Sequence, residues 1–262
     1  MKNDHLYTTK LQAGLGMIPE TKTLLELWEP GMKNSELFQI SLGSGIFSNI
    51  SARRLQNIVR ECFAPRYILK DNYPALVLKN LKGCLTSNEF SQLLFIFTAR
   101  ANPIFYDFVK EVYWEKYISG QEALVGELAR EFVISANHHG KTVRAWSEGT
   151  VKRVSTYLLG CCSDFGLLGN SVGKKRQFKT FRIEPKVASF LAYDLHFLGV
   201  GDNSILAHED WRLFGYQKND VRDEFNRISR TGVILYQTAG DLIRISWKYK
   251  NWGEIINVFS EN

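Results

Sequence analysis

The stretch SEGTVKRVSTYLLGCCSDFGLLGNSVGKKRQFKTFRI, residues 147–183, carries the clearest structural pattern in the sequence. Its first half predicts a helix over 147–165, because apolar residues recur there at steps of three and four and form one stripe. The stripe consists of Val151, Val154, Leu158 and Cys162. Gly166 ends the helix, and the residues after it predict an extended ribbon. A helix followed by a short turn and a basic ribbon is typical of winged helix-turn-helix modules.

The positive charge of the chain is concentrated in this region. The sequence of 262 residues holds 33 Lys and Arg against 27 Asp and Glu, a net charge of +6. Residues 141–183 hold nine of the basic residues and two of the acidic ones, so this segment carries +7 and the rest of the chain −1. A local basic excess of this kind is expected of a surface that binds the phosphate backbone of nucleic acid.

Three segments offer side chains suited to DNA. The candidates in the central segment are Lys141, Arg144, Ser147, Thr150, Lys152, Arg153, Thr156, Lys174, Lys175, Arg176, Lys179 and Arg182. A helix capped by Ser51 offers Arg53, Arg54, Gln56, Asn57 and Arg60, of which Arg, Gln and Asn are the types that read guanine or adenine edges. The C-terminal candidates are Arg244 and Lys248. The alternatives are a solvated basic loop in the centre and ordinary bundle helices near the N-terminus.

The C-terminal part predicts a second module with the same order of elements. We expect a helix over 203–214, a tight turn, a helix over 218–230, and a hairpin of 233–237 with 242–248. Alternation in the second strand turns Ile243, Ile245 and Trp247 inward, and we expect Trp247 to rest on the helix that bears Val221, Phe225 and Ile228. Because that helix also carries Asp220, Asp223 and Glu224, this module could dock protein instead of DNA.

The remaining segments also favour helices. One begins near Pro19, one covers 34–42, one runs from Ser51 to a stop at Ala64-Pro65, and a long one places Leu124 on its apolar face. The fold class is therefore mainly α: a helical bundle with helix-turn-helix or winged-helix-like elements and one or two small β-hairpins. We expect three domains, an N-terminal helical one over 1–118, a central basic winged-helix-like one over 119–184 and a C-terminal one over 185–262.

Enzyme motifs are weak in this sequence. Residues 169–175 resemble a phosphate loop but have the wrong glycine spacing, and His138-His139 diverge on a helix and cannot share a metal. Asp164 followed by Glu184-x-Lys186 resembles a metal-dependent nuclease pattern, but Pro185 disfavours the hairpin that such motifs require. We therefore expect a protein that is not an enzyme and has no catalytic residue, no metal and no cofactor.

The cysteines and the N-terminus indicate the compartment. Four cysteines are too few for a disulfide scaffold in a chain of this length, which favours packed, reduced thiols. The first residues include no apolar signal core, and no apolar stretch is suited to span a bilayer. We expect a cytoplasmic protein that does not contact a membrane and is a monomer on its own.

Several stretches resemble the BrxA family of BREX phage-exclusion systems. They are Leu11-Gln-Ala-Gly14, Ile18-Pro-Glu-Thr-Lys-Thr-Leu-Leu25 with Leu27-Trp28, Arg53–Tyr67, and the closing Trp252-Gly-Glu254. The resemblance implies a cytoplasmic, mostly helical, non-catalytic protein that binds double-stranded DNA in phage defence and acts beside other BREX proteins. An adaptor that holds other BREX subunits through degenerate winged modules is the alternative, and a metal-dependent nuclease is a remote one.

Overall fold

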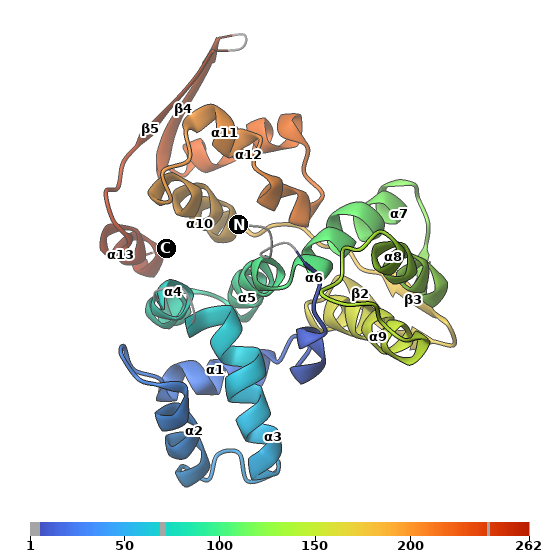
Figure 1. The fold of residues 1–262 in the computed structure, drawn as a ribbon. Coiled ribbons are helices and arrows are strands. Elements are labelled where there is room, and N and C mark those ends of the chain that lie inside the picture. The colour runs from blue at the N-terminus through green and yellow to red at the C-terminus, as the bar shows by residue number, and fades with distance from the viewer. Residues whose placement is uncertain (1–5, 69–71, 240–241, 262) are drawn as a thin grey trace. The chain divides into compact units, whose positions relative to one another are not determined.

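The computed structural model describes residues 6–68, 72–239 and 242–261. The chain divides into two compact units. Helices dominate both (Figure 1), which confirms the mainly α fold class that the sequence predicted. Unit 1 comprises the residues up to Lys79 and Leu94–Thr180, and unit 2 comprises Asn80–Leu93 and the residues from Phe181 onward. The expected boundary between residues 118 and 119 falls inside unit 1. The expected boundary at 185 lies four residues after the chain enters unit 2.

Unit 1 holds most of the helices and a small sheet. Its elements are η1 (Lys10–Ala13), α1 (Ile18–Leu27), α2 (Asn34–Gly43), α3 (Ala52–Asn57), the π-helix η2 (Ile58–Ile68), most of α4 (Tyr73–Leu81), the larger part of α5 (Ser87–Ala101), α6 (Pro103–Phe108), η4 (Val109–Tyr113), α7 (Trp114–Ile118), β1 (Ala123–Val125), α8 (Gly126–His138), α9 (Glu148–Asp164), β2 (Leu168–Val172) and β3 (Lys175–Phe178).

The sheet of unit 1 is antiparallel and has the strand order β1-β3-β2. Helices α8 and α9 lie between β1 and β2 in the sequence, so the hairpin returns to pair with the strand that precedes both helices. Leu124 was expected on the apolar face of a helix, and this prediction was wrong. Leu124 is fully buried in β1 opposite Arg176, because the edge of β3 provides it with a ladder partner, and α8 starts only at Gly126.

The helix capped by Ser51 continues farther than predicted. The Ser51 hydroxyl accepts a hydrogen bond from the Arg54 amide, as expected of an N-cap. The helix was predicted to stop at Ala64-Pro65, but it continues through these residues and ends at Ile68. Residues from Ile58 onward form a π-helix. Proline stops an α-helix because its ring clashes with the carbonyl four residues earlier and because it has no N–H to bond to that carbonyl. In a π-helix the bonds span five residues, so Pro65 faces a different set of carbonyls.

Aromatic side chains build the core of unit 1 beneath the sheet. Tyr113 packs edge-on against Phe178 of β3 with ring centroids 5.2 Å apart, and its hydroxyl donates to the Leu167 carbonyl at 3.0 Å. Phe165, at the end of α9, contacts Phe95 and Phe105. The helix before β1 and the hairpin after α9 therefore share one core within unit 1.

Unit 2 repeats the order of helices followed by a hairpin. Its elements are η3 (Lys82–Cys84), α10 (Pro185–Phe197), α11 (Asp202–Leu206), η5 (Glu209–Phe214), α12 (Lys218–Arg230), β4 (Ile234–Ala239), β5 (Leu242–Trp247) and α13 (Trp252–Glu261). The bounds of α12 and the pairing of β4 with β5 agree with the helix and the hairpin predicted for this region. The helix expected over 203–214 is two short ones, because the His208 ring accepts from the Asp210 amide and starts a new 3₁₀ turn.

The β4–β5 hairpin, hereafter the C-terminal hairpin, rests on a different helix from the one predicted. Trp247 stacks on His196 of α10 with centroids 4.1 Å apart, and its Nε1 donates to the Asp202 carboxylate at 3.1 Å. The Tyr193 hydroxyl accepts from the Lys248 amide. Tyr236 of β4 is the residue that meets α12, at Phe225. Trp247 of β5 thus packs on α10, whereas Tyr236 of β4 packs on α12. The prediction that Trp247 rests on the helix of Val221, Phe225 and Ile228 was wrong.

Candidate nucleic-acid interface

Helix α9 presents a polar face beside a buried one. The predicted apolar stripe is buried, whereas Lys152, Arg153 and Thr156 are exposed. Ser147 is the N-cap, and its hydroxyl accepts from the Thr150 amide and contacts the Thr150 hydroxyl at 3.1 Å. These two side chains therefore stabilise the start of the helix, since an N-cap satisfies an amide that has no intrahelical partner. The exposed cations begin one turn later.

The connection between α8 and α9 is long but ordered. Asn137 organises it: its Oδ1 accepts from the Trp146 amide at 2.8 Å and the Thr142 hydroxyl at 3.2 Å, and its Nδ2 donates to the Trp146 carbonyl. Thr142 also pairs with Tyr7 in an isolated parallel bridge. Lys141 and Arg144 are exposed on this connection. A single amide side chain therefore orders this long connection.

The acidic residues of this region are engaged by neighbours. Glu148, in the first turn of α9, forms an ion pair with Arg130 of α8 at 3.0 Å. Asp164, at the other end of α9, accepts from the Gly16 amide at 2.8 Å. Both carboxylates therefore have a partner within the protein, and the exposed cations between them face solvent.

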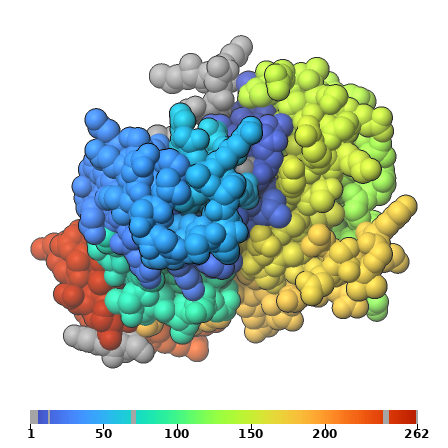
Figure 2. All heavy atoms as spheres, turned by 90° about the horizontal axis from the view of Figure 1, so that it is seen from below, coloured from blue at the N-terminus to red at the C-terminus, as the bar shows by residue number. Residues whose placement is uncertain are grey.

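The β2–β3 hairpin, hereafter the basic hairpin, carries two kinds of cation. Lys174, Lys175 and Lys179 are exposed, and in Figure 2 this yellow segment projects from the surface. Arg176 is half-buried instead, and its Nη1 donates to the Ser163 hydroxyl of α9 at 2.6 Å. Alternation along β3 produces this split, because neighbouring side chains point to opposite faces of a strand. Arg176 therefore fastens the hairpin to α9, whereas the lysines are available to a partner.

Helix α3 lies close to α9 across a hollow. Arg53, Asn57 and Arg60 are exposed, and Arg54 and Gln56 are half-buried. Figure 2 shows dark-blue N-terminal residues between the light-blue residues of this part of the chain and the yellow-green residues of α9. The hollow between them measures about 480 Å³, and we call it the α3–α9 hollow. It is lined by Thr9, Lys10, Gln12, Arg54, Asn57, Glu61 and Tyr157.

One peptide segment holds the two helices in place. The buried Arg66 guanidinium of η2 donates to the carbonyls of Gly14 and Leu15. On the other side, Leu15 lies over Gly160 of α9, where an added Cβ would come within 2.6 Å of Leu15 Cδ1. Glycine in a helix interior is destabilising on its own, so its position here allows close packing. The segment that follows η1 is therefore fixed between η2 and α9.

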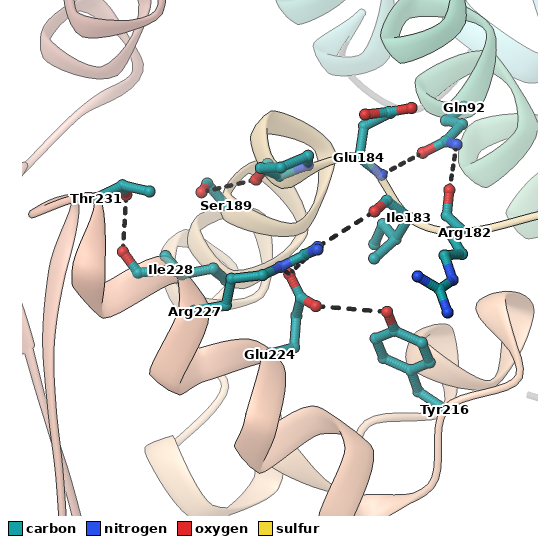
Figure 3. Close-up of polar contacts among 11 residues, drawn as sticks. Gln92, Arg182, Ile183, Glu184, Ser189, Tyr216, Glu224, Arg227, Ile228 and Thr231 are labelled. Atoms are coloured by element: carbon teal, nitrogen blue, oxygen red, sulfur yellow. Dashed lines mark hydrogen bonds and ion pairs between the residues drawn. The ribbon is translucent and has the colours of Figure 1, made fainter.

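Three of the candidates belong to unit 2, whereas the basic hairpin belongs to unit 1. Arg244 and Lys248 are exposed on and after β5. Figure 3 shows the segment of Arg182, whose carbonyl accepts from Gln92 Nε2 at 2.7 Å, while Gln92 Oε1 accepts from the Glu184 amide. The same figure shows Arg227 donating to the Ile183 carbonyl.

The carboxylate of Glu224 and the phenol of Tyr216 complete this polar cluster in unit 2. Glu224 is buried, forms an ion pair with Arg227 at 2.7 Å and accepts from the Tyr216 hydroxyl. Burial, with the nearby Glu224 carboxylate, raises the pKa of Tyr216 to about 12. Arg182 was predicted together with the cations of the basic ribbon. It belongs to unit 2, whereas those of the basic hairpin belong to unit 1.

Several residues of the α3–α9 hollow were not predicted from the sequence. Thr9, Lys10 and Gln12 lie in or beside the short η1, and packing of the chain is what brings them to α3. Glu61 carries a detectable signal, since Arg54, Asn57 and Glu61 follow a spacing of three and four residues along one helix face. Tyr157 directly follows Thr156, which was predicted to contact DNA.

The residues of the nuclease-like pattern have structural roles. Glu184 precedes α10 and accepts from Asn88 at 2.6 Å, and Lys186 donates to the carbonyls of Cys84 and Phe259. These residues start a helix, whereas the pattern requires a strand. Within the described ranges there is no group of three or more His, Cys, Asp or Glu residues that could hold a metal, and no helix is long and apolar enough to cross a membrane.

The cysteines are free thiols. Cys62, Cys161 and Cys162 are buried, and Cys84 is half-buried. Burial raises the pKa of the Cys161 and Cys162 thiols, which keeps them protonated. This agrees with the packed thiols predicted from the sequence.

The fold and this surface define a mainly helical protein in which a helix and a hairpin present exposed cations. The family model of BrxA matches residues 5–194, and the chain belongs to the BrxA family. It is thereby a component of BREX phage-defence systems. The crystal structure of an uncharacterized protein from Magnetospirillum magneticum is similar in fold, with a TM-score of 0.59 and 14% identity over 79% of this chain and 97% of that one. The comparison with curated proteins gave no match.

Proposed function

We propose that this protein is a non-catalytic accessory component of its BREX system that binds double-stranded DNA through α9 and the basic hairpin. The observation that carries the proposal is that Lys174, Lys175 and Lys179 of the hairpin segment and Lys152 and Arg153 of α9 are all exposed. The order strand, two helices and a returning hairpin supports a winged-helix-like module, with α9 as the helix that enters the major groove. Phosphate contacts then come from the hairpin.

A salt titration of duplex binding with paired variants tests the proposal. We expect Lys174→Glu/Lys175→Glu to weaken binding to all sequences alike, because phosphate contacts carry no sequence information. The slope of log affinity against log salt should fall by about 0.9 for each phosphate group that the variant no longer neutralises. The matched control is Arg244→Glu/Lys248→Glu, the same charge change on the C-terminal hairpin. Unchanged affinity in the first variant, or an equal decrease in both, would contradict DNA binding by the basic hairpin.

The non-catalytic part of the proposal has its own test. We expect no cleavage of duplex DNA when the protein is incubated with Mg²⁺, since Glu184 and Lys186 hold other parts of unit 2 together. Magnesium-dependent cutting that disappears in Glu184→Ala, while the variant keeps the unfolding curve of the parent protein, would show that the protein is a nuclease.

A second candidate function concerns unit 2. Its hairpin presents Leu235, which is 52% exposed, and the adjoining α12 mixes acids with bases. A surface of this composition suits a protein partner better than phosphate. Under this alternative, unit 2 holds another BREX subunit. Leu235→Glu would then abolish co-purification of the other operon products and leave duplex affinity unchanged.

A further inference from the structure

We infer that the α3–α9 hollow receives the sugar-phosphate backbone of one strand of the same duplex that α9 and the basic hairpin contact. The inference rests on the proposed function and extends it to residues outside the basic segment. Its consequence is that helix α3 and helix α9 act on one DNA molecule as a single surface.

The chemistry of the lining favours a phosphodiester. Lys10 and Arg54 can only donate hydrogen bonds and both carry positive charge. Thr9, Gln12, Asn57 and Tyr157 add further groups that can donate. A volume of about 480 Å³ admits the ridge of one strand but not a duplex. The two non-bridging oxygens of a phosphate, which accept hydrogen bonds and carry a negative charge, complement such a lining.

The position of the hollow connects it to the exposed cations on both sides. Tyr157 follows Thr156 and lies one turn of α9 beyond Arg153, and Arg53 and Arg60 are exposed on the α3 side. A strand that leaves α9 can therefore continue across the hollow and along α3 within unit 1. Arg66 and Gly160 hold Leu15 and so fix the segment that follows η1, which limits how far Lys10 and Gln12 can move before DNA binds and lowers the entropic cost of binding.

Glu61 affects DNA affinity in opposite directions for the two possible occupants of the hollow, a phosphate or a base. It is the one carboxylate among the residues that line the hollow, and it is exposed on η2. A carboxylate beside a phosphate repels it, so Glu61 opposes binding if the occupant is a strand backbone. If the hollow instead read a base, Glu61 would accept from the amino group of cytosine and would support binding to sites that contain it.

The experiment measures the affinity of the full chain for two blunt duplexes, one rich in G·C and one rich in A·T, across a salt series. We expect Glu61→Gln to tighten binding to both duplexes severalfold. Lys10→Ala should weaken binding to both and lower the salt slope by about 0.9. The control for Glu61→Gln is Glu131→Gln, the same change at an exposed position on α8, which should have a smaller effect.

Three outcomes would overturn the inference and remain distinct from failure of the proposed function. Weaker binding of Glu61→Gln to the G·C-rich duplex alone would show that the carboxylate reads a base. Unchanged affinity in both Glu61→Gln and Lys10→Ala, with a large decrease in Lys174→Glu/Lys175→Glu, would leave DNA on the hairpin and the hollow empty. A decrease in Lys10→Ala that is matched by an altered unfolding midpoint would assign the residue to folding. Salt-independent binding by the parent protein would instead reject the proposed function itself.

Discussion

The basic hairpin and the C-terminal hairpin follow the same order of elements, yet they differ in charge and in attachment. Residues 165–183 carry five basic residues and no acid, whereas residues 231–248 carry two bases and one acid. The basic hairpin gains a third strand from β1, while β4 and β5 pair only with each other within the described residues. A backbone ladder therefore supports the first hairpin, and side chains of α10 and α11 support the second.

This difference explains which side chains each hairpin can offer to a partner. Because β1 and Arg176 fix the basic hairpin, its lysines need no structural role and remain exposed. In the C-terminal hairpin Trp247 must pack on His196 and donate to Asp202 to hold the strands in place. The β1–β3 hydrogen bonds thus hold the basic hairpin without using its exposed side chains. The C-terminal hairpin instead uses its own side chains to stay in place, so fewer of them are available to a partner.

Removing the side-chain anchor should have the largest effect on stability. We expect Trp247→Ala to cost about 3 kcal/mol, near the lower end for truncating a core Trp because the ring is half-buried. The reason is that the variant lacks the His196 stack, the Tyr193 packing and the Asp202 hydrogen bond together. Urea unfolding measures the cost, and hydrogen exchange of the β4 and β5 amides localises it.

The matching change in the basic hairpin removes a ring but leaves the third strand in place. Phe178→Ala removes a ring of similar burial that packs on Tyr113 and Tyr117, but the β1 ladder stays. We expect the β3 amides to keep most of their protection in this variant. Equal reduction of protection in both hairpins would show that the third strand does not provide the difference.

The next effect concerns the close packing under α9. Gly160→Val should destabilise unit 1 by about 1–3 kcal/mol, because the added atoms would overlap the position of Leu15 and overpacking strains a core. Thermal unfolding gives the free energy of unfolding. Gly149→Val, at a helical glycine with open space around it, is the control, since it changes the same residue type on the same helix without a clash. A similar cost at both positions would mean that helix propensity, and not packing, dominates.

A smaller effect separates structural from binding cations. Arg176→Met should lower stability by about 1–2 kcal/mol, because the Ser163 hydroxyl is left without its charged donor in a half-buried environment. Lys175→Met should leave stability unchanged, since Lys175 is exposed. Affinity for the duplex should fall more in Lys175→Met than in Arg176→Met. If the affinity falls equally in both variants, Arg176 also contacts DNA and the division between the two faces of β3 is wrong.

Several elements could be predicted from the sequence because local signals decided them. The apolar stripe indicated α9, and the order of a helix followed by two strands indicated α12 and the C-terminal hairpin. The errors occurred where a distant partner decides. Leu124 is a strand residue because β3 pairs with it, and Trp247 packs on His196 because α10 lies behind β5. Lys10 reaches the α3–α9 hollow through packing that no spacing indicates.

The smallest predicted effect is a pH dependence of the C-terminal hairpin. Burial lowers the pKa of His196, and the nearby Asp202 carboxylate opposes this shift only in part. The unfolded chain therefore binds a proton at His196 more readily than the folded one. The contribution to stability is then fully present above the ordinary value of about 6.5 and is lost as the pH falls below it.

We accordingly expect the urea midpoint to fall modestly between pH 7.5 and pH 5.5, with the sign given by the lowered pKa. His196→Phe keeps an aromatic ring against Trp247 but cannot titrate, so the fall should be smaller in that variant. An NMR titration of the His196 ring checks the cause directly. A ring that titrates above its ordinary range would mean that the stacked indole and Asp202 stabilise the imidazolium, and acid would then strengthen the C-terminal hairpin instead of weakening it.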